Sequence, residues 1–254
     1  MTKTSQINRA LSTSSPSEQE LDRHLELAKL SHDNEVVFFH LLLNAKVYAH
    51  APISDDHLRT RLIQFKHPDG FYAVPFFTSL SKALFASGPS VRIVESTGRE
   101  LLQGTPGATF MLNPNDGGCV LYPEEVVALL KDGSIARVET LEHDDSEPLE
   151  ALAEANPPVW LKSRLMALYM GMPSVRAAYL LELPPLDGGS RFLVAMGVDP
   201  VHAERAVRAS TTAIHKKCAE EGICLDISTF NPVVGKPDYL HQDGVERFYG
   251  PEIA

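Results

Sequence analysis

An acidic segment just beyond the middle of the chain places the tightest limit on how the sequence can fold. Five of the nine residues from 142 to 150 are Asp or Glu, and Pro148 lies among them. A segment with so few apolar side chains cannot easily join a hydrophobic core. The 254 residues of the chain are enough for two domains of ordinary size around it. We therefore predict a disordered tail at residues 1–17, a first domain at 18–131, an acidic linker at 132–156 and a second domain at 157–254.

Turn and capping signals predict both helices and strands in the first domain. Ser15-Pro16-Ser17-Glu18 has the form of a capping box, with Ser15 as the helix cap and Pro16 at the first helical position. Apolar segments at 62–65 and 71–74 flank His67-Pro68-Asp69-Gly70. This run is typical of a hairpin turn, because Pro presets its own backbone and Gly permits a positive φ.

The second domain carries a different order of elements. Apolar segments predict strands at 175–183, 192–198 and 223–227. Asp199-Pro200 favours the start of a long helix that runs to about Glu221 and ends at Gly222. The order is β–β–α–β. Together, the two halves predict an α/β (α+β) protein with two mixed-sheet domains and flanking helices.

Charge and hydropathy exclude two classes of partner. Acidic residues outnumber basic ones by 33 to 23, which gives a net charge of −10. A surface that binds nucleic acid must be basic, so we expect no nucleic-acid partner. A membrane-spanning helix needs about 20 consecutive apolar residues. The longest apolar stretch, at 36–45, is interrupted by His40 and Asn44, so we expect no membrane insertion.

The cysteine content indicates a reducing compartment. Cys119, Cys218 and Cys224 are an odd number of thiols in a long chain, which does not fit a disulfide framework. The N-terminus also lacks the apolar core of a signal peptide. We therefore expect a cytoplasmic protein.

Several segments, in their order and spacing, resemble the SseB (enhanced serine sensitivity) family. The strongest likeness is Gly107-Ala108-Thr109-Phe110-Met111-Leu112-Asn113-Pro114 followed by Pro123-Glu124-Glu125-Val126, since family members tend to carry a Leu-Asn-Pro loop before a Pro-Glu-Glu helix. Further likenesses are Phe38-Phe39-His40-Leu41-Leu42 with Val47-Tyr48, Pro75-Phe76-Phe77-Thr78-Ser79, and Arg247-Phe248-Tyr249 in the second half. The resemblance implies N-terminal and C-terminal SseB domains in a bacterial protein, and a loose link to amino-acid (serine) homeostasis. It implies no catalytic residue.

The loop and helix start that carry this resemblance are also the best candidate contact site. Asn113, Pro114, Asn115 and Asp116 precede two glycines, and such a loop can present backbone N–H groups and an amide side chain to a ligand or partner. Glu124 and Glu125 complement the dipole of the following helix and disfavour an anionic ligand there. The alternative use of Asn-Asp-Gly-Gly is simply a hairpin turn.

Other chemistry has little support in the sequence. Cys119 follows two glycines, but no Lys or Arg lies nearby in the chain to stabilise a thiolate. The histidines at 40, 50, 57 and 67 have no spacing typical of metal ligands. No nucleophile elbow, Walker loop or dinucleotide fingerprint is present in the sequence. We therefore expect no cofactor and no metal, and we assign no catalytic residue.

Three functions remain open. The first is a non-catalytic binding or regulatory protein that acts through protein–protein contacts, and a homo-oligomer is compatible with it. The second is a small-molecule-binding protein or enzyme of amino-acid or sulfur metabolism that uses the loop from Asn113 to Cys119. The third is a type III secreted or effector-like protein, suggested only by the Ser/Thr-rich and acid-free residues 1–17. A pocket of about 300 Å³ beside the Asn-Pro loop would support the second.

Overall fold

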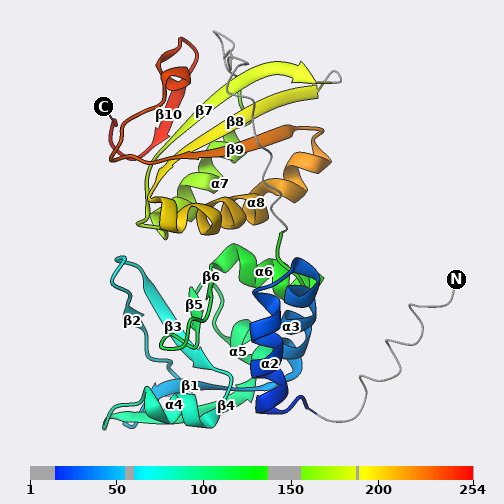
Figure 1. Ribbon diagram of the computed structural model, residues 1–254, viewed down its shortest axis with the longest axis vertical. Coiled ribbons are helices and arrows are strands. Elements are labelled where there is room, and N and C mark those ends of the chain that lie inside the picture. The colour runs from blue at the N-terminus through cyan, green and yellow to red at the C-terminus, as the bar shows by residue number, and fades with distance from the viewer. Residues whose placement is uncertain (1–14, 55–59, 137–155, 187–188, 254) are drawn as a thin grey trace, which may run out of the picture. The chain divides into compact units, whose positions relative to one another are not determined.

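The computed structural model describes residues 15–54, 60–136, 156–186 and 189–253. The chain divides into two compact units, one of Met1–Phe65 and Tyr72–Ser134 and the other of Lys66–Phe71 and Ile135–Ala254. Each holds a mixed sheet with flanking helices, which confirms the predicted fold class (Figure 1). Most of the predicted tail and acidic linker lies outside the described residues, so their boundaries stay predictions.

The first unit contains a sheet with parallel and antiparallel pairs. Its strand order is β4-β1-β3-β5-β6, and the short β2 also pairs with β3. Only β3 and β5 run parallel among these pairs. The strands are β1 (Lys46–Pro52), β2 (Phe65–Lys66), β3 (Tyr72–Phe77), β4 (Val91–Thr97), β5 (Phe110–Leu112) and β6 (Val120–Leu121). The helices are α2 (Glu18–Ala28), α3 (His32–Asn44), α4 (Leu80–Phe85), α5 (Gly98–Gly104) and α6 (Pro123–Asp132).

The core of the first unit occupies both faces of this sheet. Tyr48 and Phe77 pack with Ala83 of α4 on one face. Successive strand residues point to opposite faces, and Val47 and Phe76 are as fully buried as Tyr48 and Phe77. Both faces are therefore covered, and a short helix such as α4 is held by the sheet rather than by its own length.

The first helix begins two residues later than the sequence indicated. Ser17, and not Ser15, is the cap of α2, because its hydroxyl accepts the N–H of Glu20 at 3.2 Å. The Ser15 hydroxyl instead donates to the carbonyl of Asn44 at the end of α3. The pattern thus located a helix start correctly but assigned the cap to the wrong serine.

The second unit has a four-stranded sheet in the order β10-β7-β8-β9. Its strands β7 (Val175–Leu186), β8 (Gly189–Val198) and β9 (Cys224–Phe230) and its helix α8 (Ala203–Glu220) occur in the predicted β–β–α–β order. The unit also contains α7 (Val159–Met170), which is the helix that Asn156-Pro157-Pro158 and the spacing of Leu161, Leu165 and Leu168 predict. Its other elements are η1 (Pro200–His202), η2 (Asp238–His241) and β10 (Glu246–Tyr249). The Asp199-Pro200 signal therefore starts a 3-10 turn, and α8 follows it.

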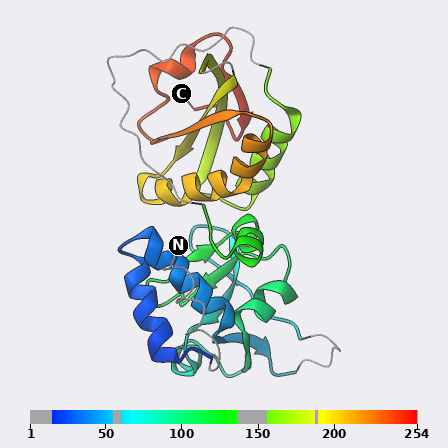
Figure 2. The same ribbon diagram turned by 90° about the vertical axis from the view of Figure 1, so that its right-hand side faces the viewer.

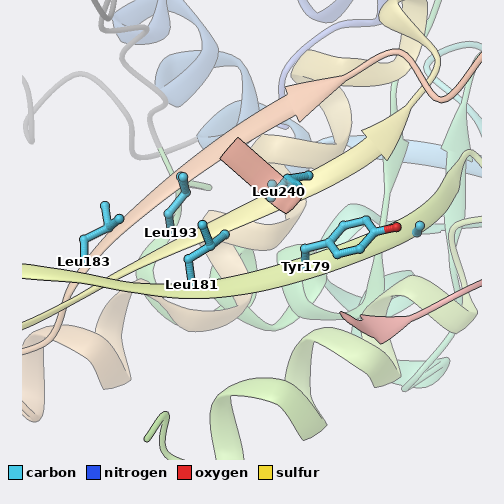
Figure 3. Packing of buried hydrophobic residues seen from close by; sticks show 7 residues of the cluster. Tyr179, Leu181, Leu183, Leu193 and Leu240 are labelled. Atoms are coloured by element: carbon cyan, nitrogen blue, oxygen red, sulfur yellow. The ribbon is translucent and has the colours of Figure 1, made fainter. Parts of the chain in front are cut away.

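Alternate residues of β7 build the cluster drawn in Figure 3. Tyr179, Leu181 and Leu183 point to one face of the sheet, where Leu193 of β8 and Leu240 of η2 join them. On the other face, Met196 lies 3.5 Å from the hydroxyl of Ser210 in α8. The middle parts of β7 and β8 are thus buried on both sides of the sheet. No described helix of either unit is long and apolar enough to cross a bilayer.

A glycine fixes the approach of α5 to α3 in the first unit. Thr97 and Glu100 form a complete capping box at the start of α5, and Gly98 is buried immediately behind the cap. A Cβ atom built on Gly98 would lie 2.1 Å from the carbonyl oxygen of Leu42 in α3. The two helices therefore meet backbone to backbone at this point. Figure 2 shows the blue helices α2 and α3 of the same unit lying side by side.

We expect Gly98→Ala to destabilise the first unit by about 1–3 kcal/mol, because the new methyl group must push α5 away from α3. Gly104→Ala is the matched control in the same helix, since nothing lies within 4 Å of a Cβ there. The control should change the free energy of unfolding by less than about 1 kcal/mol. Urea unfolding followed by circular dichroism measures both, and equal midpoints for the two variants would contradict the close contact.

Candidate functional site

The parallel pairing of β3 and β5 brings two distant segments of the first unit to the same edge of the sheet. β3 and β5 are paired in a register that sets Phe76 opposite Leu112. The residues that follow the two strands, Thr78 and Asn113, therefore emerge side by side. In open α/β sheets the carboxyl ends of parallel strands are where ligands commonly bind.

A buried amide joins these two segments. The side-chain oxygen of Asn113 accepts the backbone N–H of Thr78 at 3.0 Å, and its amide nitrogen donates to the Thr78 hydroxyl at 3.0 Å. The backbone N–H of Asn113 donates to the carbonyl of Phe76 at 2.9 Å. Asn113 is only 1% exposed, and its φ of 43° is the left-handed conformation that Asn tolerates better than most residues.

The rest of the loop is closed as a hairpin. The N–H of Asp116 donates to the carbonyl of Asn113 at 2.9 Å, and the N–H of Leu112 donates to the carbonyl of Cys119 at 2.9 Å. Gly117 has a φ of 60°, and a Cβ on Gly118 would collide with the carbonyl of Leu112. The turn alternative raised by Asn-Asp-Gly-Gly therefore describes the backbone correctly, and the same turn also carries exposed side chains.

Helix α2 is tied to this edge through carboxylates. The Thr78 hydroxyl donates to Asp22 of α2, and the backbone N–H of Leu80 donates to Glu18 at 3.0 Å. Burial, together with a hydrogen bond to the same Glu18, raises the pKa of Tyr48 to about 12. Glu18 thus links α2 to the start of α4 and to the interior strand β1.

Lys82 of α4 lies at the centre of the charged groups. Its ammonium donates to Asp22 at 2.8 Å and to the Thr78 hydroxyl at 3.3 Å, and it pairs with Asp116 at 2.9 Å. Partial burial lowers the pKa of Lys82, but the hydrogen bonds to Asp22 and Asp116 outweigh it, so the pKa lies above its ordinary value. The hydrogen bond from Lys82 in turn holds the pKa of Asp116 below its usual range. At neutral pH both groups are therefore charged.

A pocket of about 270 Å³ opens beside these groups. Its walls come from β3, α4 and the loop after β5. The lining residues are Phe77, Ser81, Lys82, Phe85, Asn113, Asn115 and Asp116. Its volume is close to the value of about 300 Å³ that the small-molecule hypothesis required.

The mouth of the pocket carries unusually exposed apolar side chains. Phe85 is 84% exposed although its ring lines the pocket, and the neighbouring Leu84 is 56% exposed and Leu80 43%. Ser81 and Phe85 are four residues apart and share the pocket side of α4, while Leu80 and Leu84 share an adjacent side. We call Leu80, Leu84 and Phe85 the α4 surface.

The predicted site residues separate into two groups. Asn113, Asn115 and Asp116 line the pocket, whereas Pro114, Glu124 and Glu125 are not part of its wall. Glu125 is fully buried, and its carboxylate accepts the N–H of Tyr122 at 2.9 Å at the start of α6. The Pro-Glu-Glu start therefore caps the helix that follows the loop.

None of the three cysteines is part of this pocket. Cys119 is half-buried, Cys218 is buried and Cys224 is exposed, and none forms a disulfide. Cys218 lines a smaller cavity of about 200 Å³ between α8 and the start of β9. Burial raises the pKa of Cys218 to about 11, so this thiol stays protonated at neutral pH.

Sequence reasoning missed half of the site. Thr78, Lys82, Phe85 and Asp22 were not candidates, because they lie far from the loop along the chain. The family-like segment Pro75-Phe76-Phe77-Thr78-Ser79 was the available signal. Its Thr78 bonds directly to Asn113 of the Leu-Asn-Pro loop, so the two segments that carry the resemblance meet at one site.

We expect Asn113→Ala to cost roughly 2–4 kcal/mol of stability, because it leaves the Thr78 N–H without its acceptor and places Ala at positive φ. Asn113→Gly loses the same hydrogen bonds but tolerates the backbone angle, so it should be about 1 kcal/mol less damaging. Asn115→Ala, on the exposed part of the loop, should change stability by less than about 0.5 kcal/mol. Chemical unfolding measures the series, and equal values for the Ala and Gly variants would show that φ carries no cost.

Comparison with known proteins identifies the unit that holds this site. Residues 21–128 match the family model described as the SseB protein N-terminal domain, a range that includes Asp22, α4 and the Asn113 loop. No curated protein and no solved structure matches the chain. The match ends before residue 135, where the main part of the second unit begins, and the resemblance of that part to the family's C-terminal domain stays a prediction. The first unit therefore carries an SseB protein N-terminal domain at residues 21–128.

Proposed function

We propose that the protein is a non-catalytic binding or regulatory protein, and that it contacts a partner protein through the α4 surface and the adjoining pocket. The observation that carries the proposal is the position of Phe85. The Phe85 ring is 84% exposed at the rim of a pocket, where its contact with water is unfavourable and a partner could bury it. Aromatic side chains, Phe among them, are enriched in protein interfaces relative to the rest of the surface.

The energy available at this surface is sufficient for a specific contact. Complete burial of a Phe or Leu side chain stabilises a complex by about 1.5–3 kcal/mol. Phe85, Leu84 and Leu80 lie on one short helix whose start is held by Ser79 and Glu18, so little ordering is needed on binding. A preformed apolar patch of this kind favours recognition of a partner segment.

The polar groups of the pocket favour binding over catalysis. Lys82 is a protonated ammonium held between two carboxylates, so it cannot serve as a general base or as an amine nucleophile at neutral pH. The Asn113 amide is committed to Thr78. These side chains hold the loop and α4 together, which is the task of a scaffold around a binding surface.

The volume of the pocket supports a second candidate, a receptor for a small molecule such as an amino acid. The family label makes serine the first ligand to test. The three thiols, none of which is in a disulfide, are in keeping with the cytoplasmic location that we propose. In this alternative the pocket alone would be the site, and Leu84 would have no part in it.

We expect the double variant Leu84→Ser, Phe85→Ser to lose its partner in affinity purification from the native host. Both side chains are exposed, so the free energy of unfolding should change by less than about 0.5 kcal/mol. Quantitative mass spectrometry compares the proteins retained by the wild type and by the variant. Val127→Ser on α6 is the matched control, because Val127 is 63% exposed in the same unit but lies outside the pocket wall.

Recovery of the same proteins with the double variant would refute the proposed surface. A thermal-shift screen of the twenty amino acids tests the alternative in parallel. Stabilisation by serine that is unchanged by Leu84→Ser, together with no partner lost, would favour the small-molecule receptor instead.

A further inference from the structure

The ammonium of Lys82 has no hydrogen left for a ligand. An ammonium group has three N–H donors, and Lys82 directs them to Asp22, Thr78 and Asp116. An anionic group that entered the pocket would have to displace one of these partners. Lys82, the only cation among the described residues of the pocket wall, is therefore an internal counter-ion.

The two carboxylates, in contrast, can still accept hydrogen bonds from a positively charged ligand. Asp22 and Asp116 share one ammonium between them, so this group of three charges carries a net −1. Asp116 keeps 61% of its side chain exposed, and a carboxylate has about four lone-pair sites to offer. Lys29 adds a weaker attraction to Asp116, but its own ammonium is bonded to Glu26 at 2.6 Å. Negative charge is thus in excess at the loop side of the pocket.

The pocket wall also contains apolar side chains. Phe77 and Phe85 form a wall against which an aliphatic stem can pack, and a cation close to the Phe85 ring face is attracted by its quadrupole. A volume of about 270 Å³ is below that of most sites for drug-sized ligands and suits one long side chain. Leu80 and Leu84 extend the apolar surface beyond the pocket, where only a longer chain can cover them.

We propose that the pocket takes a single basic side chain, preferably arginine, from an extended segment of the partner protein whose neighbouring apolar residues cover Leu80 and Leu84. This inference rests on the proposed function and specifies which side chains the partner's contact segment carries. The guanidinium lies against the Asp116 carboxylate and the Asn115 amide, and the stem packs on Phe85. Arginine is preferred because its planar group pairs with a carboxylate in two parallel hydrogen bonds and stacks on aromatic rings.

The test uses the full chain and fluorescein-labelled peptides. Each peptide carries one variable residue between leucines in a Gly/Ser frame, and that residue is arginine, its neutral isostere citrulline, or glutamate. Fluorescence anisotropy should show the arginine peptide binding about tenfold more tightly than the citrulline peptide, a preference that weakens as NaCl is added. Asp116→Asn should remove most of this preference, and Asp116→Lys should invert it towards the glutamate peptide.

Two further variants complete the design. Phe85→Ala should weaken the binding of the arginine peptide and of the citrulline peptide by a similar factor, because it removes apolar contact rather than charge. Asp132→Asn, which removes an exposed carboxylate of the same unit outside the pocket wall, should keep the full arginine preference. Thermal unfolding verifies that each variant is folded. Asp116→Asn leaves the Asn113–Thr78 bonds in place.

Equal binding of the arginine and citrulline peptides to the wild type, retention of the preference in Asp116→Asn, or no binding of any peptide would each overturn the inference. These results are distinguishable from failure of the proposed function. If the double variant Leu84→Ser, Phe85→Ser loses a cellular partner that the wild type retains, the α4 surface is supported and only the assignment of a basic side chain to the pocket is wrong. If that double variant keeps its partner, the proposed surface itself is wrong.

Discussion

The hydrogen bonds between the Asn113 amide and Thr78 are the contact on which the rest of the first unit's functional edge depends. Where β3 and β5 end, the backbone of Thr78 would lose its sheet partner, and the Asn113 side chain takes over as acceptor. The bond orients the Thr78 hydroxyl towards Asp22 and so brings in α2. One buried amide thereby connects a strand end, a loop, and the α2–α4 pair.

This arrangement explains how a six-residue helix can present a functional surface. An isolated helix as short as α4 is not stable in water. Its first turn is capped by the Ser79 hydroxyl, its middle is anchored by Ala83 in the core, and Lys82 connects it to Asp22 and Asp116. With these three attachments in place, Leu84 and Phe85 can face solvent without serving the fold. The fold tolerates the exposure of these two side chains because other residues of the helix hold it in place.

The sequence predicted the features that depend on local chemistry and missed those that depend on pairing. The hairpin character of the Asn113 loop follows from Asn-Asp-Gly-Gly, and the fold class follows from the spacing of apolar segments. The partners of Asn113 could not be found in this way, because Thr78 is 35 residues away and parallel pairing leaves no short-range pattern. Apolar spacing on α4 would also favour burial of Leu84 and Phe85, whereas the structure buries the smaller Ala83. Glu125 behaves similarly: its helix-start position was evident, but its complete burial as a cap was not.

The net negative charge of the chain attracts basic partners in general, whereas the pocket beside Asp116 can select one basic side chain. A net charge of −10 argues against nucleic acid and raises the local concentration of basic partners within about 10 Å of the surface. Such long-range attraction does not select a binding site. Selection requires a place where a positive group meets a fixed carboxylate and its stem meets an apolar wall. The pocket between α4 and the Asn113 loop meets both conditions, since Lys82 uses its donors internally and leaves Asp116 exposed in a wall that also contains Phe85. Replacement of Lys82 by a neutral residue would therefore strengthen the attraction of a basic segment to the pocket while it weakened the anchoring of α4, so the same lysine limits affinity and maintains the shape of the site.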